Sequence, residues 1–459
     1  MNNNFTIAKF GGTSVANVSA IEHCTQIIKK SPQTRIIVVS AQSGVTNLLV
    51  ELVTTCTTKV CVNNVVQQIS AIIDPILHSI CDLSISNKIK LILDDLTMLG
   101  IMAIRLKTPQ LSDEVLSFGE HISAILVTAS LVNTGLSAIY LDSKTIIKTN
   151  SHFGHAKALI QDIKTNSDVF LLPLVKDHMV VMEGFVGSDI HGQTTTLGRG
   201  GSDYSASLLA ESTQAEALYI WTDVPGIYQV NPRIIPTAQA IKNMTFNEAA
   251  ELSVFGAKII HPNTLWPVIR NNINVFIGST FNPEESGTWI TKSTQNNLPV
   301  IRALAERKNQ VLLTIKSYDM VHAQGFLAKV FSILSEHKVS VDLVTTSEVS
   351  IALTLDHIGS QSIGNTLLTA SLMNDLHGIG DVDIKVDNNL SLIAVVGNDI
   401  HLTKNISNRV FSELTDYNIR LFSHGASGHN ICLLVDKSDA QNIIRNIYSQ
   451  FFNNEARVL

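Results

Sequence analysis

The sequence is poor in charge and in long apolar runs, and each shortage excludes a class of protein. Charged residues make up 16% of the 459 positions and the net charge is −6, so no basic face is available for a nucleic acid or another polyanion. No run reaches the roughly 18 apolar residues that a membrane helix needs. The first residues, MNNNFTIAKFGG, lack the apolar stretch of a signal peptide. We therefore expect a cytoplasmic protein of two or three domains.

Cysteine is also scarce. The 5 cysteines are an odd number and form no CxxC pair, which argues against a disulfide framework. In a cytosolic protein such residues are usually reduced thiols in the core. We expect this state for all of them: Cys24, Cys56, Cys61, Cys81 and Cys432.

Glycine, by contrast, is concentrated in residues 184–210, GFVGSDIHGQTTTLGRGGSDYSASLLA, which follow an apolar strand at 178–183. The pattern predicts a strand, a glycine-rich loop and a helix whose N-terminus attracts an anion. Arg199 can hold a carboxylate or phosphate with two hydrogen bonds. Asp203 fits such a site when it faces a cation, so the loop suits an amino acid, a metal–nucleotide, or both. The alternative is a purely structural turn, because the spacing matches neither the dinucleotide fingerprint nor the P-loop.

The first fifty residues repeat this arrangement. A strand at 5–10 ends in Lys9 and Phe10, a glycine turn follows, and a helix, a β-branched strand at 35–39 and a small-polar loop at 40–46 come next. Strand ends in α/β sheets open into the ligand crevice, where Lys9 can place its charge on a phosphate. A surface lysine on an edge strand is the alternative.

Residues 48–107 carry apolar stripes typical of helices, and Glu120 precedes a helix expected at 121–131. A carboxylate near a helix start favours capping, but it can also receive a substrate ammonium. A strand at 217–221 then leads into Thr222 and Asp223, which suit a nucleotide or form a plain Asx turn. We expect residues 274–279 to close a largely parallel sheet covered by helices on both faces.

The C-terminal third contains an internal repeat. Residues 325–356 and 405–436 align without gaps at an offset of 80, and each copy reads as strand, helix, two strands and helix. This is a small split βαβ module present twice, which can pair at its edge and favour a dimer. A duplicated packing domain without a ligand is the alternative.

Five motifs in this order resemble those of the aspartate kinases, specifically the monofunctional, lysine-inhibited kind. They are Lys9 to Val15 (KFGGTSV), Phe118 to Glu120 (FGE), Gly198 to Asp203 (GRGGSD), Thr222 to Tyr228 (TDVPGIY) and Phe255 to Lys258 (FGAK). The resemblance covers essentially the whole chain. It implies an amino-acid-kinase fold, a mostly parallel sheet between helices, at 1–292, followed by ferredoxin-like (βαββαβ) ACT modules at 300–388 and 389–459.

The resemblance also implies an activity and a set of site residues. The reaction is transfer of the ATP γ-phosphate, with Mg²⁺, to the side-chain carboxylate of L-aspartate, which opens lysine, threonine and methionine synthesis. The implied catalytic residues are Lys9, Arg199 and Asp203, with Asp203 also bearing on Lys9. Aspartate would be held by Thr46, Glu120, Arg199, Ser202 and Asp203. ATP would be held by Lys9, Gly11, Gly12, Thr13, Ser14, Thr222, Asp223, Tyr228, Arg233 and Lys258. Asp203 would organise the metal or the substrate ammonium, and the resemblance leaves the direct metal ligands open.

The first module resembles a site for the inhibitor L-lysine. Asp342 and Glu348 can pair with the two ammonium groups of lysine, and Phe326 and Leu327 can cover its stem. The implied site comprises Met320, Ala323, Gly325, Phe326, Leu327, Ser340, Val341, Asp342, Ser347 and Glu348. At the offset of 80, Phe422 and Gly425 replace Asp342 and Thr345, so we expect the second module to be structural or to contact a dimer partner.

Two departures from the family pattern occur, and two other functions compete. Position 231 is Asn where the family usually has Asp, and position 323 is Ala where lysine-sensitive relatives usually have Ser. Another amino-acid kinase, acting on glutamate or a nucleotide, is one competing function. A non-catalytic amino-acid sensor is the other, although Lys9, Arg199 and Asp203 argue against decay of the site. We expect a homodimer or a dimer of dimers formed through the ACT modules.

Overall fold

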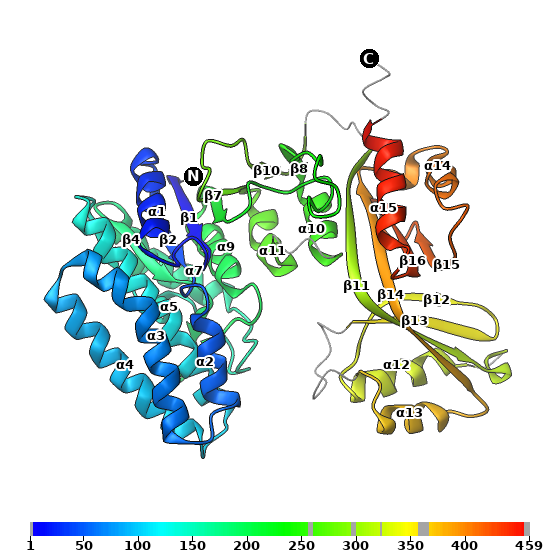
Figure 1. Cartoon of the computed structure of the whole chain (residues 1–459), viewed down its shortest axis with the longest axis horizontal. Coiled ribbons are helices and arrows are strands. Elements are labelled where there is room, and N and C mark those ends of the chain that lie inside the picture. The colour runs from blue at the N-terminus through cyan, green and yellow to red at the C-terminus, as the bar shows by residue number, and fades with distance from the viewer. Residues whose placement is uncertain (1–2, 256–259, 295–299, 322–323, 357–366, 454–459) are drawn as a thin grey trace. The chain divides into compact units, whose positions relative to one another are not determined.

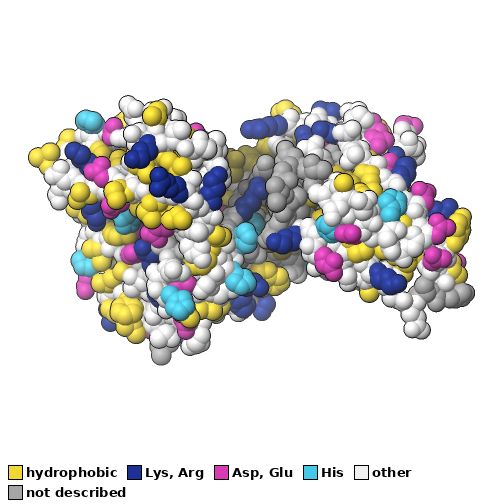
Figure 2. All heavy atoms as spheres, turned by 90° about the horizontal axis from the view of Figure 1, so that it is seen from below, with side chains coloured by type: hydrophobic (Ala, Val, Ile, Leu, Met, Phe, Trp, Pro, Cys, Tyr) yellow, Lys and Arg dark blue, Asp and Glu magenta, His cyan; other side chains and the backbone are white. Residues whose placement is uncertain are grey.

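A computed structural model describes residues 3–255, 260–294, 300–321, 324–356 and 367–453 (Figure 1). The chain divides into two compact units. The first comprises residues 1–227, 240–253 and 258–295, and the second comprises 228–239, 254–257 and 296–459. Lys and Arg side chains are scattered among apolar and acidic ones on the face drawn in Figure 2, as the low net charge suggests.

The first unit is built on an eight-stranded sheet in the order β3-β4-β2-β1-β7-β9-β10-β8. Its pairs are parallel except for β9 with β10. The strands in sheet order are Ala138–Tyr140, Met179–Glu183, Thr34–Val39, Asn3–Phe10, Ala215–Thr222, Asn274–Ser279, Thr288–Thr291 and Asn243–Thr245. The prediction that residues 274–279 close the sheet was wrong, because β10 and β8 continue it beyond β9.

Helices cover both faces of this sheet. One core combines Ala8 and Phe10 of β1 with Ile37 and Val39 of β2 and with residues of the first five helices. Figure 1 shows four of these helices, α2 to α5, as a bundle in blue to cyan. The five helices are α1 Val18–Lys30, α2 Val45–Thr54, α3 Lys59–Ile80, α4 Leu83–Ala103 and α5 Pro109–Asn133.

The opposite face of β1 carries Ile7 and Lys9, since side chains alternate along a strand. Helix α9 (Gly201–Thr213) packs against β1, β2 and β7 and against α11 (Pro262–Asn271). The remaining elements are α6 Ser143–Ile146, α7 Ile160–Asn166, a π-helix Ser167–Leu171, α8 Leu172–Val175, the pair β5 Val186–Ser188 and β6 Thr194–Thr196, and α10 Phe246–Val254.

Helices α3 and α5 are long and apolar enough to span a membrane by length and composition alone. Helix α5 packs against β2, β3 and β4, and 61% of its most apolar window is buried inside the unit. Helix α3 directs a stripe from Val62 to Ile80 into the same core. Both therefore serve here as packing helices of an α/β unit.

Two local predictions need correction. Glu120 does not begin a helix, because α5 starts eleven residues earlier, at Pro109 behind the N-cap Thr108. Cys56 and Cys61 are not reduced thiols but form a disulfide. The turn between α2 and α3 brings their Cα atoms to 5.5 Å, inside the range that a disulfide requires. Cys24 and Cys432 are buried and form no disulfide, as expected, whereas Cys81, which also forms none, is exposed.

The second unit contains a six-stranded sheet in the order β12-β13-β11-β14-β16-β15, which is symmetric about its two central strands. The strands are β11 Ile301–Lys316, β12 Ser340–Thr346, β13 Ser350–Asp356, β14 Asp383–Gly397, β15 Ile419–His424 and β16 Asn430–Asp436. The helices are α12 Phe326–Glu336, α13 Ala370–His377, α14 Ile406–Ser412 and α15 Ala440–Tyr448, with short 3₁₀ turns at Tyr318–Met320 and Ile400–Leu402 and a π-helical turn at Ser449–Asn453.

The two central strands each serve both modules. Residues 310–316 of β11 pair with 383–390 of β14 in the first module, and residues 301–307 pair with 392–397 in the second. The second module therefore encloses the first in the sequence, whereas the segments predicted at 300–388 and 389–459 are consecutive. Residues Val230 and Ala238 also pack into the core of the second module.

The repeat is present, but its alignment is not free of gaps. The offset of 80 holds for β13 and β16, where Leu355 and Val435 are equivalent. On the outer strands, however, Val341 pairs with Leu355 and Ile419 pairs with Val435, an offset of 78. The segment before β15 is two residues shorter, so the predicted match of Phe422 with Asp342 was wrong.

Candidate active site

The carboxyl ends of β1, β2, β4 and β7 lie side by side because these strands are parallel. Backbone bonds tie their loops together: Gly11 N donates to Trp221 O at 3.0 Å, Ser43 N to Gly12 O at 3.1 Å, and Gly184 N to Val39 O at 2.8 Å. A Cβ on Gly12 would lie 2.8 Å from Ala41 O, so only glycine fits there. The predicted phosphate turn is thus held closely against the β2 loop.

Lys9 and Asp203 meet at this edge. The Lys9 ammonium lies 2.5 Å from Asp203 Oδ1, and the two side chains are 10% and 15% exposed. Lys9 reaches Asp203 because it points to the face of β1 that α9 covers, and Asp203 lies in the first turn of α9. The pair fixes one cation of the site, near the glycine turn, in a largely dry environment.

Glu120 is buried in the middle of α5, at 4% exposed. Burial raises the pKa of its carboxyl to about 8; the backbone amide of Ala41 and the charge of Lys9 act in the opposite direction, and Glu183 adds to the rise. Its Oε2 atom has no hydrogen-bond partner among the described residues. Buried acceptors without partners are rare, so this oxygen fits a donor supplied by a ligand.

Glu183, at the end of β4, belongs to a network that sequence reasoning missed. It accepts hydrogen bonds from Tyr140 OH, from Ser143 N at 2.8 Å and from His121 Nδ1 at 3.0 Å. Burial alone would raise the pKa of Glu183, but the hydrogen bonds from His121 and Tyr140 outweigh it and hold the pKa below its usual range. A fixed negative charge thus sits close enough to Glu120 to raise its pKa.

The glycine-rich loop before α9 forms another part of the candidate site. Gly198 and Gly200 have positive φ values of 74° and 73°, and a Cβ on Gly200 would meet His261 at 2.4 Å. Arg199 between them is exposed. Burial and the nearby Arg199 charge lower the pKa of His261, while Asp203 acts in the opposite direction. The loop therefore presents Arg199 outward beside the Lys9–Asp203 pair.

The other predicted contacts of aspartate and of the ATP phosphates differ in their exposure. Ser202 packs against Gly184, where an added Cβ would meet it at 2.5 Å. Thr46 is exposed in the first turn of α2, and Thr13 is half-buried. Ser14 is fully buried and its hydroxyl is bonded to Thr280 Oγ1 at 2.6 Å. Ser14 thus joins β1 to the end of β9 rather than offering a hydroxyl to a ligand.

The predicted nucleotide residues are divided between the units. Thr222 ends β7, and its hydroxyl donates to the neighbouring Asp223 Oδ1 at 3.0 Å. Tyr228 and Arg233 belong to the second unit. Asn231 Oδ1 accepts from Arg233 N at 3.0 Å, so the amide keeps a turn that an aspartate could also make. Lys258 lies outside the described residues.

The predicted lysine site surrounds β12 and the start of α12. Asp342 Oδ2 lies 2.9 Å from Arg307 Nη1, and both side chains are largely buried.

The other residues of the predicted lysine site differ in exposure. Gly325 caps α12 with a φ of 83°, Phe326 is buried in the module core and Leu327 is partly exposed. Ser340 and Val341 are half-buried on β12, Met320 is half-buried, and Ser347 and Glu348 are exposed. Ala323 lies outside the described residues.

Comparison with known proteins settles the family. A model of the amino acid kinase family matches residues 4–279, and an ACT domain model matches residues 393–451. Lysine-sensitive aspartokinase 3 of Escherichia coli is 42% identical over 97% of this chain and 99% of its own length. The chain belongs to the aspartokinase family. Chloroplastic aspartokinase 2 of Arabidopsis thaliana is 33% identical over 98% of this aspartokinase and 84% of its own length.

Solved structures agree with this assignment. E. coli aspartokinase III in complex with aspartate and ADP (R-state) is 42% identical, covers 98% of this chain and 100% of its own, and gives a TM-score of 0.89. The same enzyme with lysine and aspartate (T-state) gives 0.83 at 41% identity, over 98% of this chain and 100% of its own. The predicted amino-acid-kinase and ACT fold is therefore confirmed.

One buried carboxylate of this aspartokinase carried no sequence signal. Asp113 accepts from Gly154 N at 2.8 Å, Thr196 N at 2.9 Å and Thr196 Oγ1 at 2.8 Å. Burial raises its pKa, and these hydrogen bonds oppose the rise. Asp113 thereby holds the end of β6, just before the Arg199 loop. Its partners lie far from it in the chain, so no motif could have revealed it.

Proposed function

We propose that this chain is an ATP-dependent aspartate kinase. It transfers the γ-phosphoryl group of ATP to the side-chain carboxylate of L-aspartate, giving 4-phospho-L-aspartate, the first step toward lysine, threonine and methionine. The observation that carries this proposal is the Lys9–Asp203 pair beside the Gly11–Gly12 turn, together with the buried Glu120 oxygen that awaits a donor. A cation at the end of β1 and a carboxylate on helix α5 that lacks a hydrogen-bond donor suit a phosphate and an ammonium.

The reaction requires positioning and charge neutralisation more than covalent help from the protein. The acceptor carboxylate is ionised at neutral pH, so no general base is needed. Its oxygen attacks the γ-phosphorus while the bond to the ADP oxygen breaks. Lys9 neutralises the transferred group, and Asp203 holds the Lys9 ammonium in place at 2.5 Å. Gly11, Gly12 and Thr13 line the turn that approaches the phosphates.

Aspartate would lie between Glu120 of α5 and Arg199 of the glycine loop. Glu120 Oε2 would accept from its α-ammonium, and Arg199 would hold its α-carboxylate with two hydrogen bonds. Ser202 and Thr46 would contact its polar ends. We keep Thr222, Asp223, Tyr228, Arg233 and Lys258 as nucleotide contacts and drop the Ser14 hydroxyl, which Thr280 already occupies.

Mg²⁺ suits the same chemistry. In kinase sites it retains water and is bound by substrate phosphates with one or two carboxylates. Asp203 offers such a carboxylate at the phosphate turn, so the residues present fit this ion. When bound, Mg²⁺ would neutralise charge on the ATP phosphates.

L-Lysine is the proposed feedback inhibitor, bound at the first module by Asp342, Glu348 and their neighbours. The Asp342 carboxylate would receive one ammonium of lysine beside the Arg307 guanidinium. The chain would act in the cytoplasm as a homodimer or a dimer of dimers joined through the ACT modules.

A hydroxamate assay of aspartyl phosphate tests the activity and its regulation together. Purified enzyme with ATP, Mg²⁺ and aspartate should form aspartyl hydroxamate, and lysine should suppress the signal more strongly than threonine or methionine. Lys9→Ala and Arg199→Ala should each reduce turnover at least about 10³-fold with folding intact. Near-normal turnover in either variant would remove that residue from the mechanism, and phosphorylation of glutamate in place of aspartate would overturn the substrate assignment.

A further inference from the structure

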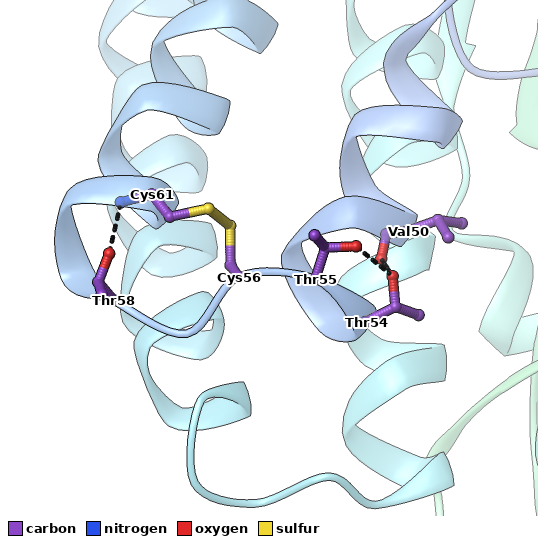
Figure 3. Close-up of a disulfide and its surroundings, with 6 residues drawn as sticks. All are labelled: Val50, Thr54, Thr55, Cys56, Thr58 and Cys61. Atoms are coloured by element: carbon purple, nitrogen blue, oxygen red, sulfur yellow. Dashed lines mark hydrogen bonds between the residues drawn. A yellow bond between two sulfur atoms is a disulfide. The ribbon is translucent and has the colours of Figure 1, made fainter.

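The turn between α2 and α3 gathers two sulfur atoms and a carboxylate away from the site described above. Glu51 lies in the last turns of α2, and its carbonyl accepts from Thr55 N at 2.9 Å and Cys56 N at 3.1 Å. Cys61 lies in the first turn of α3, where its amide donates to the N-cap Thr58 Oγ1 at 3.2 Å. Figure 3 shows Cys56 and Cys61 joined across this turn, with the bond from the Cys61 amide to Thr58.

Cys56 and Cys61 are joined by a disulfide across a sequence separation of 5. A cross-link stabilises a fold mainly by restricting the unfolded chain, and the effect shrinks as the closed loop shortens. This loop is already ordered by the Thr58 cap. Cys56 is 2% exposed, but Cys61 is only half-buried and its neighbour Val60 is 68% exposed. The bond adds little constraint and can be reached by a reductant.

The same three residues form a candidate ligand set for a metal. A sulfur from Cys56, a sulfur from Cys61 and a carboxylate oxygen from Glu51 all lie within 4.8 Å of one another. Zn²⁺ accepts thiolate and carboxylate ligands in a tetrahedron, with water in a remaining position. The thiolate is the form of cysteine that binds metal.

We propose that Glu51, Cys56 and Cys61 form a redox-gated site for Zn²⁺. In the oxidised state the disulfide occupies both sulfurs and no metal binds. A soluble dithiol reduces the bond: the disulfide gains two electrons and two protons, and the dithiol becomes a disulfide. The two thiols then lose two protons and bind Zn²⁺ together with the Glu51 carboxylate.

The chain supplies its own controls. Cys81 is exposed and free, so it reports what an isolated surface thiol does. Cys24 and Cys432 are buried, and burial raises the pKa of the Cys24 thiol well above its usual value, which keeps it inert. None of these three belongs to the ligand set.

The test uses Co²⁺ as a spectroscopic substitute for Zn²⁺ with the full-length protein. Reduced, dithiol-free protein should give a sulfur-to-cobalt charge-transfer band saturating at one Co²⁺ per chain, and equimolar Zn²⁺ should remove it. Air-oxidised protein should give no band and should show two fewer titratable thiols than the reduced protein after unfolding. Cys56→Ser and Cys61→Ser should each lose the band, and Glu51→Gln should weaken Co²⁺ binding about tenfold or more.

Cys81→Ser is the matched control and should bind Co²⁺ as the original protein does. The proposal fails if oxidised and reduced proteins bind Co²⁺ equally, or if Cys81→Ser loses the band. It also fails if reduced protein, folded by circular dichroism, gives no sulfur-to-cobalt band. An equal thiol count before and after oxidation would likewise overturn it.

Discussion

Asp342 on β12 and Arg420 on β15 occupy equivalent positions in the two ACT modules, and their partners are equivalent as well. Arg307 on β11 pairs with Asp342, whereas Asp387 on β14 pairs with Arg420 at 2.7 Å. The two modules thus carry the same ion pair with its charges exchanged. The first pair is 10% and 15% exposed, and the second is 31% and 22% exposed.

This exchange shows how one fold can hold two different surfaces after duplication. The strand order and the register around the central strands are preserved, because they bury the cores. On the outer strands, a side chain at this position can carry either a negative or a positive charge without disturbing the packing of the core. A cationic inhibitor would meet a carboxylate on β12 but a guanidinium on β15, so we expect the two modules to differ in ligand binding.

The largest expected effect is on inhibition by lysine. Asp342→Asn should raise the lysine concentration for half-inhibition at least about tenfold, since a charge-assisted hydrogen bond contributes roughly 1.5–3 kcal/mol. Arg420→Ala, the equivalent change in the second module, should leave that concentration within about twofold. The hydroxamate assay over a lysine series measures both. Equal effects of the two substitutions would remove the functional difference between the modules.

A second effect concerns stability. Arg307→Ala leaves the largely buried Asp342 without its 2.9 Å partner and should cost about 2–3 kcal/mol. Arg420→Ala should cost less than about 1 kcal/mol, because its pair is more exposed. Calorimetry of the full chain compares the two through the shift of the transition of the second unit. A larger loss with Arg420→Ala would reverse the ranking.

The number of lysine molecules bound per chain also tests the difference between the two modules. Because the second module has a guanidinium where the first has a carboxylate, isothermal titration should give one lysine per chain. Glu348→Gln should weaken lysine binding by at most about fivefold, since Glu348 is exposed and its charge is screened. Two lysines per chain would contradict the assignment of the second module.

A further effect concerns the first unit rather than the ACT modules. Only ionised Glu120 attracts an ammonium, and its pKa is raised to about 8, so apparent aspartate affinity should rise as pH increases from 7 to 9, by up to about tenfold. Glu183→Gln removes a nearby negative charge and should move the midpoint of this rise to lower pH. KM measured across this range provides the check, with Asp342→Asn as a variant that should not shift the midpoint.

Sequence patterns predicted much of this molecule because they are local. The strand–glycine–helix units at Lys9 and Gly198, the helical bundle of 48–107 and the repeated module all follow from periodicity and glycine placement. The predicted influence of Asp203 on Lys9 agrees with their 2.5 Å contact. The roles assigned to the site residues remain proposals.

What the sequence could not reveal depends on contacts between distant segments. His121, Tyr140 and Glu183 come from α5, β3 and β4, and nothing in their spacing marks them as a network. The exchanged ion pair could not be found from the sequence repeat, because β15 is shifted by two residues relative to β12. An alignment without gaps therefore does not place Arg420 opposite Asp342. The disulfide was not predicted from the sequence, because Cys56 and Cys61 match no metal or redox motif and are brought together only by the α2–α3 turn.

The strand β11 has a consequence for how the chain is made. Residues 301–307 emerge from the ribosome some ninety residues before 392–397, the segment they pair with. During this interval the strands of the first module have all been made, while Ile301, Ala303 and Leu304 lack their partner strand. An unpaired apolar strand invites association between nascent chains. Synthesis that stalls near residue 390 should therefore yield aggregates rather than a shorter enzyme.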